Sequence, residues 1–319
     1  MSKNVRGNCP FESVVRKVRD SYDREDYVPL HVPSFVANEA NYLKDCVASG
    51  FVSSVGEYVG RFEESIASFT GAAHAVATVN GTTALRAALS LLGVRHGDLV
   101  LTQPVTFVAT ANAIVHAGAT PAFVDTDTET LGMSPQSLES FIEAHRGPRI
   151  AACVPVHVFG HVCHIPEIVE ICHRHGIPVI EDAAEALGSY RDDIHAGLFG
   201  DLGILSFNGN KTITTGGGGM MITNDENLAA RAKYVTTTAK RPHPWEYFHD
   251  EVGFNYRLPN INAALGVAQM ESLPAFLEDK RKLAEEYRAF FETIPEIEFI
   301  TEPHRCRSNY WLNAIKLPD

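Results

Sequence analysis

The chain has 319 residues, of which 45% are hydrophobic and 21% are charged, and its formal net charge is −12 at pH 7. This composition is typical of a globular protein with one large core and a smaller appendage. No dense run of Lys and Arg offsets the negative charge, which argues against a protein that binds the phosphate backbone of nucleic acids.

The amino-terminal residues, Met1 to Tyr27, carry charges of both signs and lack the apolar core of a signal peptide. No apolar stretch of the sequence is long enough to span a bilayer. The six cysteines are scattered without a framework, at positions 9, 46, 153, 163, 172 and 306. We therefore expect reduced thiols and a cytoplasmic enzyme.

The first part of the chain is predicted to lie outside the main domain. We interpret residues 1–35 as an N-terminal leader, with extended chain at Val28 to Phe35. Residues 36–70 show helical periodicity, once from Asn38-Glu39 and again from Val59 to Ala67.

From about residue 74, short apolar runs alternate with helical segments. The predicted strands are 74–79, 99–102, 122–124, 150–156, 178–181, 203–207 and 220–223. The predicted helices begin near Thr83 and Ala109 and cover about 135–145 and 166–175. Near-continuous Val, Ile and Ala runs are typical of a mostly parallel sheet that is covered on both faces. We predict an α/β large domain at residues 36–258, with ligands at the carboxyl ends of its strands.

After Leu258-Pro259 the pattern becomes helical, and we expect one helix at 262–273 and a second at 274–294. The run from Tyr310 to Leu317 is predicted to be the first strand of a smaller domain. A lone strand cannot form a stable sheet, so residues 259–319 are expected to hold interdomain helices and the start of an incomplete small C-terminal domain.

Two residues at strand ends carry most of the chemical signal. Lys211 follows an apolar strand within the run Ser-Phe-Asn-Gly-Asn-Lys, in a loop of small residues. Asp182 comes directly after the apolar run that ends at Glu181. A lysine that forms a Schiff base and a carboxylate that keeps a pyridinium nitrogen protonated are the two groups that a pyridoxal phosphate site needs most. Taken singly, Asp182 could be a helix N-cap and Lys211 an exposed or phosphate-binding lysine.

Two strand-to-helix turns could complete such a site. Gly81, Thr82 and Thr83 combine close backbone approach, hydroxyls and a helix start, which suits an anion, although a plain N-cap uses the same groups. Phe107 could stack on a flat cofactor or pack in the core.

Three further patterns are weaker. Gly216 to Gly219 fit neither nucleotide-binding glycine motif, and a sharp turn explains them better. His157, His161, Cys163 and His164 are too crowded for a structural zinc site, so we predict no metal. Asn255, Tyr256 and Arg257 precede a helix and suit an anionic ligand or a subunit contact.

Together these segments resemble the DegT/DnrJ/EryC1/StrS sugar aminotransferases over about Pro29 to Asp319. The resemblance implies the fold-type-I pyridoxal phosphate architecture, with a mostly parallel seven-stranded sheet. It implies that Lys211 forms the Schiff base, that Asp182 binds the pyridinium nitrogen and that Phe107 stacks on the ring. It also implies phosphate binding by Gly81, Thr82, Thr83 and Ser206, and a homodimer in which Asn255 reaches the phosphate of the neighbouring subunit's cofactor. Arg257 and Tyr256 are expected near the nucleotide of the substrate.

Several runs resemble one branch of this family more closely. These are 51–56, 181–188, 206–211, the four glycines and Thr236 to Lys240, with Glu185 near the cofactor and Gly217 as branch-like departures. Members of the branch aminate C4 of a UDP-4-keto-6-deoxy-N-acetylhexosamine for surface-glycan synthesis, with glutamate as the expected donor. Family members continue for several dozen residues beyond the strand at Tyr310, so the small domain is expected to be truncated here.

Four alternatives stay open. The acceptor could be another nucleotide 4-keto-6-deoxy sugar, as in perosamine synthesis. A pyridoxal phosphate-dependent sugar dehydratase is disfavoured because such members resemble this family with histidine in place of Lys211. A nicotinamide-dependent sugar reductase would need a dinucleotide fingerprint, which the sequence lacks. A truncated paralogue could bind cofactor without turnover.

Overall fold

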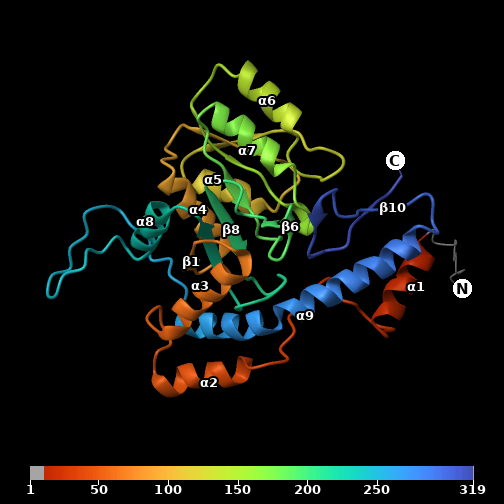
Figure 1. Ribbon diagram of the computed structural model, residues 1–319, viewed down its shortest axis with the longest axis horizontal. Coiled ribbons are helices and arrows are strands. Elements are labelled where there is room, and N and C mark those ends of the chain that lie inside the picture. The colour runs from red at the N-terminus through yellow and green to blue at the C-terminus, as the bar shows by residue number, and fades with distance from the viewer. Residues whose placement is uncertain (1–10, 319) are drawn as a thin grey trace, which may run out of the picture.

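A computed structural model describes residues 11–318, and its largest part is a sheet with helices on both faces (Figure 1). The first ten residues of the predicted leader, which include Cys9, lie outside the described residues. None of the helices between residues 11 and 318 is long and apolar enough to cross a membrane.

The central sheet of the described chain is built from a four-stranded and a three-stranded part. The strand order is β1-β9-β8-β5 in one part and β3-β2-β4 in the other, and parallel bridges from Cys153 to Val179 and from Val156 to Asp182 join β4 to β5. Only β9 runs against its neighbours among these strands. The bounds are β1 His74–Thr78, β2 Leu99–Thr102, β3 Thr120–Phe123, β4 Ile150–Val154, β5 Ile180–Asp182, β8 Leu202–Ser206 and β9 Gly219–Thr223. The predicted mostly parallel seven-stranded sheet is confirmed.

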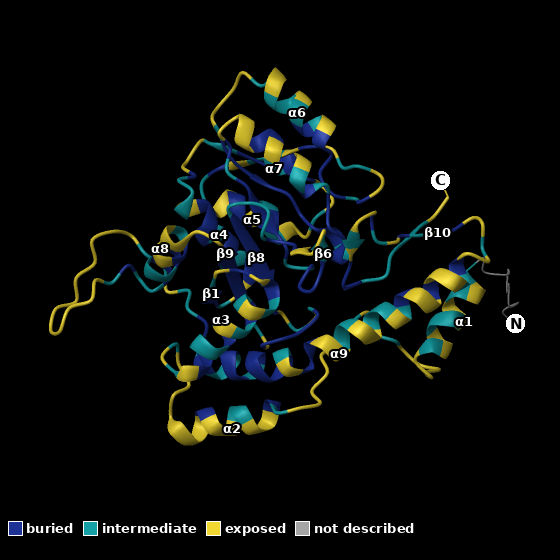
Figure 2. Cartoon of the chain, in the orientation of Figure 1, coloured by how far each residue is buried: buried dark blue, intermediate teal, exposed yellow. Residues whose placement is uncertain are grey.

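Successive residues of each strand point to opposite faces, and each face has its own hydrophobic cluster. Leu205 packs in one cluster and Ile204 in the other, and Met220 and Met221 divide in the same way. The first face is covered by α3 (Glu57–Thr70), α6 (Pro135–Ala144), α7 (Ile165–Arg174) and the first half of α9 (Asn260–Phe291). The second is covered by α4 (Gly81–Leu91), α5 (Val108–His116) and α8 (Glu226–Thr236). The strands are therefore buried between helices that are only partly exposed (Figure 2).

The predicted pair of helices after Pro259 is wrong, because α9 is one helix of 32 residues with Pro274 inside it. A proline inside a helix removes one hydrogen bond and costs about 3 kcal/mol. Packing on both sides offsets this cost: Leu273 is buried on the sheet side, and Tyr287 and Phe291 are buried further along.

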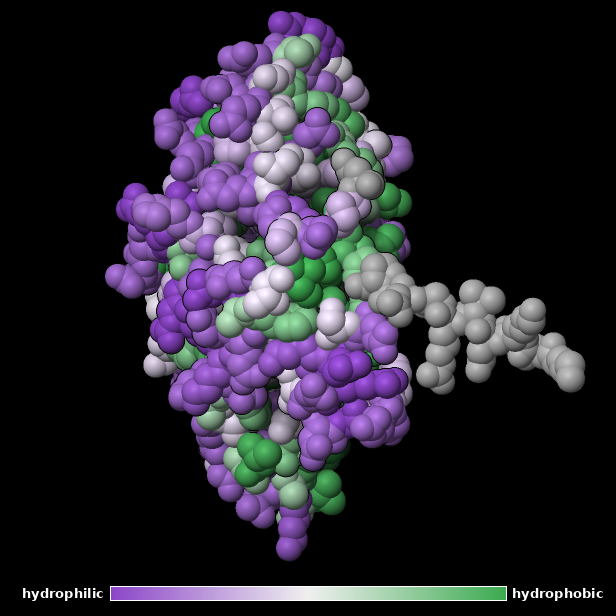
Figure 3. Space-filling view, turned by 90° about the vertical axis from the view of Figure 1, so that its right-hand side faces the viewer, coloured by the Kyte–Doolittle hydropathy of each residue, from purple (hydrophilic) through white to green (hydrophobic). Residues whose placement is uncertain are grey.

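The second half of α9 extends from the sheet toward α1 (Glu12–Ser21), where a separate small cluster forms (Figure 1). Strands β10 (Glu298–Phe299) and β12 (Ile315–Lys316) pair antiparallel beside it. From this side, hydrophobic residues form a patch within a hydrophilic surround (Figure 3). The predicted strand at 310–317 is shortened to β12, and helix α1 was missed within the predicted leader.

Smaller elements connect these parts. Helix α2 (Glu39–Ser49) packs along α9, and η1 (Val158–Gly160) follows β4. Strands β6 (Tyr190–Arg191), β7 (Ile194–His195) and β11 (Cys306–Arg307) form a small antiparallel sheet. Helix α8 was missed, although Asp225 caps its first turn as an N-cap aspartate should.

The position of Gly203 in β8 has no room for a side chain, which can be tested. A Cβ there would lie 2.3 Å from the Gly197 carbonyl oxygen, which belongs to a neighbouring loop. We expect Gly203→Ala to lower the free energy of unfolding by about 3 kcal/mol, since a backbone atom cannot rotate away. Urea unfolding measures this. The matched control is Gly60→Ala within α3, where a Cβ meets nothing within 4 Å and should stabilise the protein by about 1 kcal/mol. Equal effects at the two sites would contradict the packing.

Candidate functional site

A cavity of about 300 Å³ opens at the carboxyl ends of the parallel strands. This is the edge at which α/β sheets bind ligands. Seven of the predicted site residues line it: Gly81, Thr82, Phe107, Asp182, Glu185, Ser206 and Lys211. They come from the turn after β1, the loop after β2, the end of β5 and the segment after β8.

Lys211 lies in a turn that follows β8, where its N–H donates to the Asn208 carbonyl at 3.0 Å. Its Nζ is 3.7 Å from Oε1 of Glu185, and both side chains are nearly buried. Burial lowers the pKa of Lys211, while the carboxylates of Glu185 and Asp182 oppose that shift. Burial raises the pKa of Glu185, and Lys211 opposes it. A lysine with a lowered pKa can more readily exist as the neutral amine that nucleophilic and base chemistry requires.

Asp182 ends β5 and is held as a hydrogen-bond acceptor. Thr110 donates its hydroxyl to Oδ2 at 2.7 Å, and the Ala184 N–H donates to Oδ1 at 3.2 Å. The Thr106 and Thr110 hydroxyls lie 2.8 Å apart, which extends the chain of hydrogen bonds along α5. A carboxylate with these two donors still has lone pairs that can accept a further N–H from a ligand in the cavity.

Glu181, the neighbour of Asp182, is buried on the opposite side of β5. Its two oxygens accept the N–H groups of Gly197, Phe199 and Gly200 at 2.7–2.8 Å. His157 Nε2 also lies 2.9 Å from it. These contacts fix the strand end that presents Asp182 to the cavity.

The polar groups at the start of α4 fall into two sets, one that caps the helix and one that is free to bind an anion. Asn80 caps the helix by accepting from Thr83 N at 2.8 Å, and the Thr83 hydroxyl donates back to the Asn80 carbonyl at 2.9 Å. Thr83 therefore serves the cap and does not line the cavity. The N–H groups of Gly81 and Thr82 are in the first turn, where helices lack intrahelical acceptors, and suit an anion. A Cβ on Gly81 would lie 3.1 Å from Cβ of Ser206, so glycine permits this close approach.

Phe107 precedes α5 and is 67% exposed, while still lining the cavity. It is therefore not packed in the core, and its ring is free to contact a flat ligand.

Asn255, predicted to reach the partner's cofactor, and Tyr256 and Arg257, predicted to bind the substrate, do not line this cavity in their own chain. Asn255 is exposed, and its backbone forms an isolated β-bridge with Thr237. The backbone of Arg257 forms a similar bridge with Thr78 at the end of β1. Tyr256 stacks on Phe254 with ring centroids 4.8 Å apart. No contact within the described chain carries these three residues to Lys211.

The histidines that suggested zinc have other partners. His157 binds Glu181 and accepts the Cys163 N–H, and His161 Nδ1 lies 2.9 Å from the Ser308 hydroxyl.

Sequence reasoning missed further residues that line the cavity, among them Thr110, Asn208, Asn210 and Trp311. Thr110 had a usable signal, a hydroxyl one helical turn after Thr106. Trp311 had none, because its only link to Lys211 is through space. Its ring centroid is 3.9 Å from the lysine Nζ.

Comparison with known proteins agrees with this geometry. The model of the "DegT/DnrJ/EryC1/StrS aminotransferase family" matches residues 33–319. A GDP-perosamine synthase of Escherichia coli O157:H7 is 39% identical over 91% of this chain and 78% of its own length. The putative pyridoxal phosphate-dependent aminotransferase EpsN of Bacillus subtilis is also 39% identical, over 90% of this chain and 74% of its own.

The crystal structure of aminotransferase TlmJ from Streptoalloteichus hindustanus shares the fold. Its TM-score is 0.85 at 29% identity, over 92% of this chain and 79% of that one. The fold, the cavity residues and these relatives converge on one assignment. The chain belongs to the DegT/DnrJ/EryC1/StrS family and is a pyridoxal phosphate-dependent sugar aminotransferase.

Proposed function

We propose that this enzyme transfers the amino group of L-glutamate to C4 of a GDP-linked 4-keto-6-deoxy sugar, in the cytoplasm, for surface-glycan synthesis. The observation that carries the transamination is the meeting of Lys211 and Asp182 at one cavity. The choice of GDP rests on the GDP-perosamine synthases of Escherichia coli, Vibrio cholerae and Caulobacter vibrioides, which are 37–39% identical to this chain. These relatives favour the perosamine-like acceptor over the UDP-linked sugar that the sequence motifs suggested.

The cavity residues fit pyridoxal phosphate. Gly81 lies close against Ser206, and the first turn of α4 would offer its N–H groups to the phosphate. Asp182 would hold the proton on the ring nitrogen, and Phe107 would lie against the ring. Lys211 would hold the cofactor covalently. When bound, the cofactor supplies an electron sink and carries the amino group between donor and acceptor.

Lys211 would also move the proton that transamination requires. Its amine must be neutral to remove a proton from the donor carbon, and burial favours that state. The Glu185 carboxyl, 3.7 Å from Nζ, would keep the freed amine close to the cavity. The same lysine would reverse this proton transfer in the second half-reaction, in which the acceptor sugar receives the amino group.

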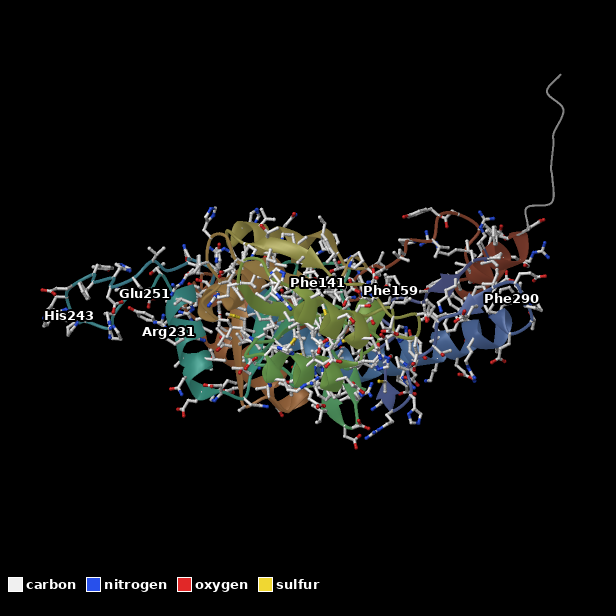
Figure 4. The ribbon with its side chains drawn as sticks, turned by 90° about the horizontal axis from the view of Figure 1, so that it is seen from above. Phe141, Phe159, Arg231, His243, Glu251 and Phe290 are labelled. Atoms are coloured by element: carbon white, nitrogen blue, oxygen red, sulfur yellow. The ribbon has the colours of Figure 1, made fainter. Side chains whose placement is uncertain are left out.

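We further propose a homodimer with shared active sites. The segment from Lys240 to Glu251 projects away from the sheet, with His243 near its tip, and Arg231 binds Glu251 at its base (Figure 4). This segment and Val252 expose large apolar side chains: Trp245 is 85% exposed, Tyr247 82% and Val252 89%. Clustered apolar exposure of this kind is typical of a surface that another subunit covers. Asn255 follows the segment and would reach the partner's cofactor.

Lys211→Ala should remove the visible absorption band of covalently held cofactor and lower turnover by at least about 10³-fold, since the amine both holds the cofactor and transfers the proton. Absorbance spectra and product formation measure the two effects. Lys282→Ala is the control, because Lys282 is exposed and pairs with Glu278 on α9. Full activity of the Lys211 variant would refute the assignment.

Substrate choice is tested with GDP-, UDP- and dTDP-linked 4-keto-6-deoxy sugars and glutamate that carries a labelled nitrogen. We expect label in the GDP-sugar product, with kcat/KM at least about tenfold higher than for the other two nucleotides. Mass spectrometry of the product identifies the acceptor. A preference for the UDP sugar would restore the earlier expectation and overturn this one.

Shared sites predict complementation between two inactive variants. Asn255→Ala and Lys211→Ala should each be impaired, but mixed subunits would carry one site with both native residues. After unfolding and refolding together, activity should recover to about a quarter of the wild-type level. A mixture of Lys211→Ala with Lys211→Met is the control and should stay inactive. No recovery in the first mixture, with dimers present, would place Asn255 outside the partner's site.

A further inference from the structure

The Lys211 amine lies close to both a carboxyl group and an aromatic face. Its Nζ is 3.7 Å from Oε1 of Glu185 and 3.9 Å from the centre of the Trp311 ring. Trp311 is 7% exposed, so this face is shielded from solvent. A cation over a desolvated indole is attracted by the negative face of the ring, whereas a neutral amine gains little.

The Trp311 ring is fixed in place from several directions. Its Nε1–H donates to the carbonyl of Asn210 at 2.7 Å, and Asn210 directly precedes Lys211. Its backbone N–H donates to Oδ1 of Asn309 at 2.8 Å, and its carbonyl accepts from Lys280 Nζ at 3.2 Å. The indole is therefore attached to the turn that carries the lysine.

The Glu185 carboxyl is also held in place. Its Oε2 accepts the N–H of Phe159 at 2.8 Å, and Phe159 adopts a left-handed conformation with φ of 57° (Figure 4 labels this residue). A bulky residue adopts that conformation only when its surroundings enforce it. The carboxyl group and the indole are thus both held in place by contacts other than those with Lys211.

Other charged groups also face Lys211. Asp182 lies in the same cavity, while His31 and Lys280 line a second cavity of about 540 Å³ that Lys211 also borders. Burial lowers the pKa of Lys280 to about 8 and that of His31 to about 4. Two carboxylates therefore favour the ammonium form of Lys211, and burial disfavours it.

We propose that Trp311 is a positioning residue that receives the Lys211 ammonium whenever this lysine is not bonded to the cofactor. The ring holds the protonated amine beside the cavity and within reach of Glu185, so that the proton can be returned to the reacting carbon. The proposal rests on the proposed role of Lys211, and it assigns to a residue 100 positions later in the sequence the task of keeping the freed amine in reach.

The test measures the pKa of Lys211 in the full chain loaded with pyridoxamine phosphate, where the lysine is free. Each protein is labelled briefly with acetic anhydride across a pH series, and mass spectrometry quantifies the modified peptide. Removing the aromatic ring of Trp311 should lower the pKa of Lys211, since the ring attracts only the ammonium form. We expect Trp311→Leu to lower it by about one pKa unit, and Trp311→Phe, which keeps a ring, to lower it by less than half as much.

Lys282 provides an internal control, because it is exposed on α9 and its labelling profile should be identical in every variant. An unchanged or raised Lys211 pKa in Trp311→Leu would overturn the proposal. So would an equal fall in Trp311→Phe, which would assign the effect to the lost bond with Asn210. If pyridoxal phosphate fails to protect Lys211 from labelling, the proposed function fails instead, independently of any shift caused by Trp311.

Discussion

The buried carboxylate of Glu181 is the interaction on which the site depends. A buried carboxyl group is stable only when its oxygens have hydrogen-bond partners, and here three backbone N–H groups and His157 supply them. The acceptor thereby ties the 197–200 loop to a strand of only three residues. Since neighbouring strand residues face opposite ways, Asp182 must then face the cavity. The position of one carboxylate is set by the burial of the other.

The sheet and half of the site could be predicted because their signals are local. Leu99–Thr102 has the predicted bounds, since an apolar run between turn residues has few alternatives as a strand. Lys211, Asp182 and Gly81 were predicted from their places at strand ends, which parallel topology brings together. Thr83 takes part in the helix cap, and capping and anion binding favour the same residue type. No sequence pattern separates the two.

The remaining errors come from tertiary packing. Pro274 predicts a helix boundary by its backbone chemistry, but the hydrophobic clusters on both sides of it outweigh one lost hydrogen bond. Trp311 reaches Lys211 across 100 residues, and an aromatic in an apolar segment carries no signal of such a contact. No sequence motif identifies the acceptor sugar, and the relatives named GDP-perosamine synthases favour the perosamine-like alternative over the UDP-linked sugar.

The strand order has a consequence for how the protein is made. Strand β1 lies far before β9 in the sequence but pairs with it, and His74 lies opposite Thr223. This edge of the sheet is therefore complete only after β9 has been synthesised. Strand β9 inserts between β1 and β8, and the turn that follows β1 carries Asn80 and Gly81. A nascent chain that lacks β9 therefore has no ordered cradle at this turn. Because contacts so distant in sequence form late, we expect this turn to become ordered only when the sheet is complete.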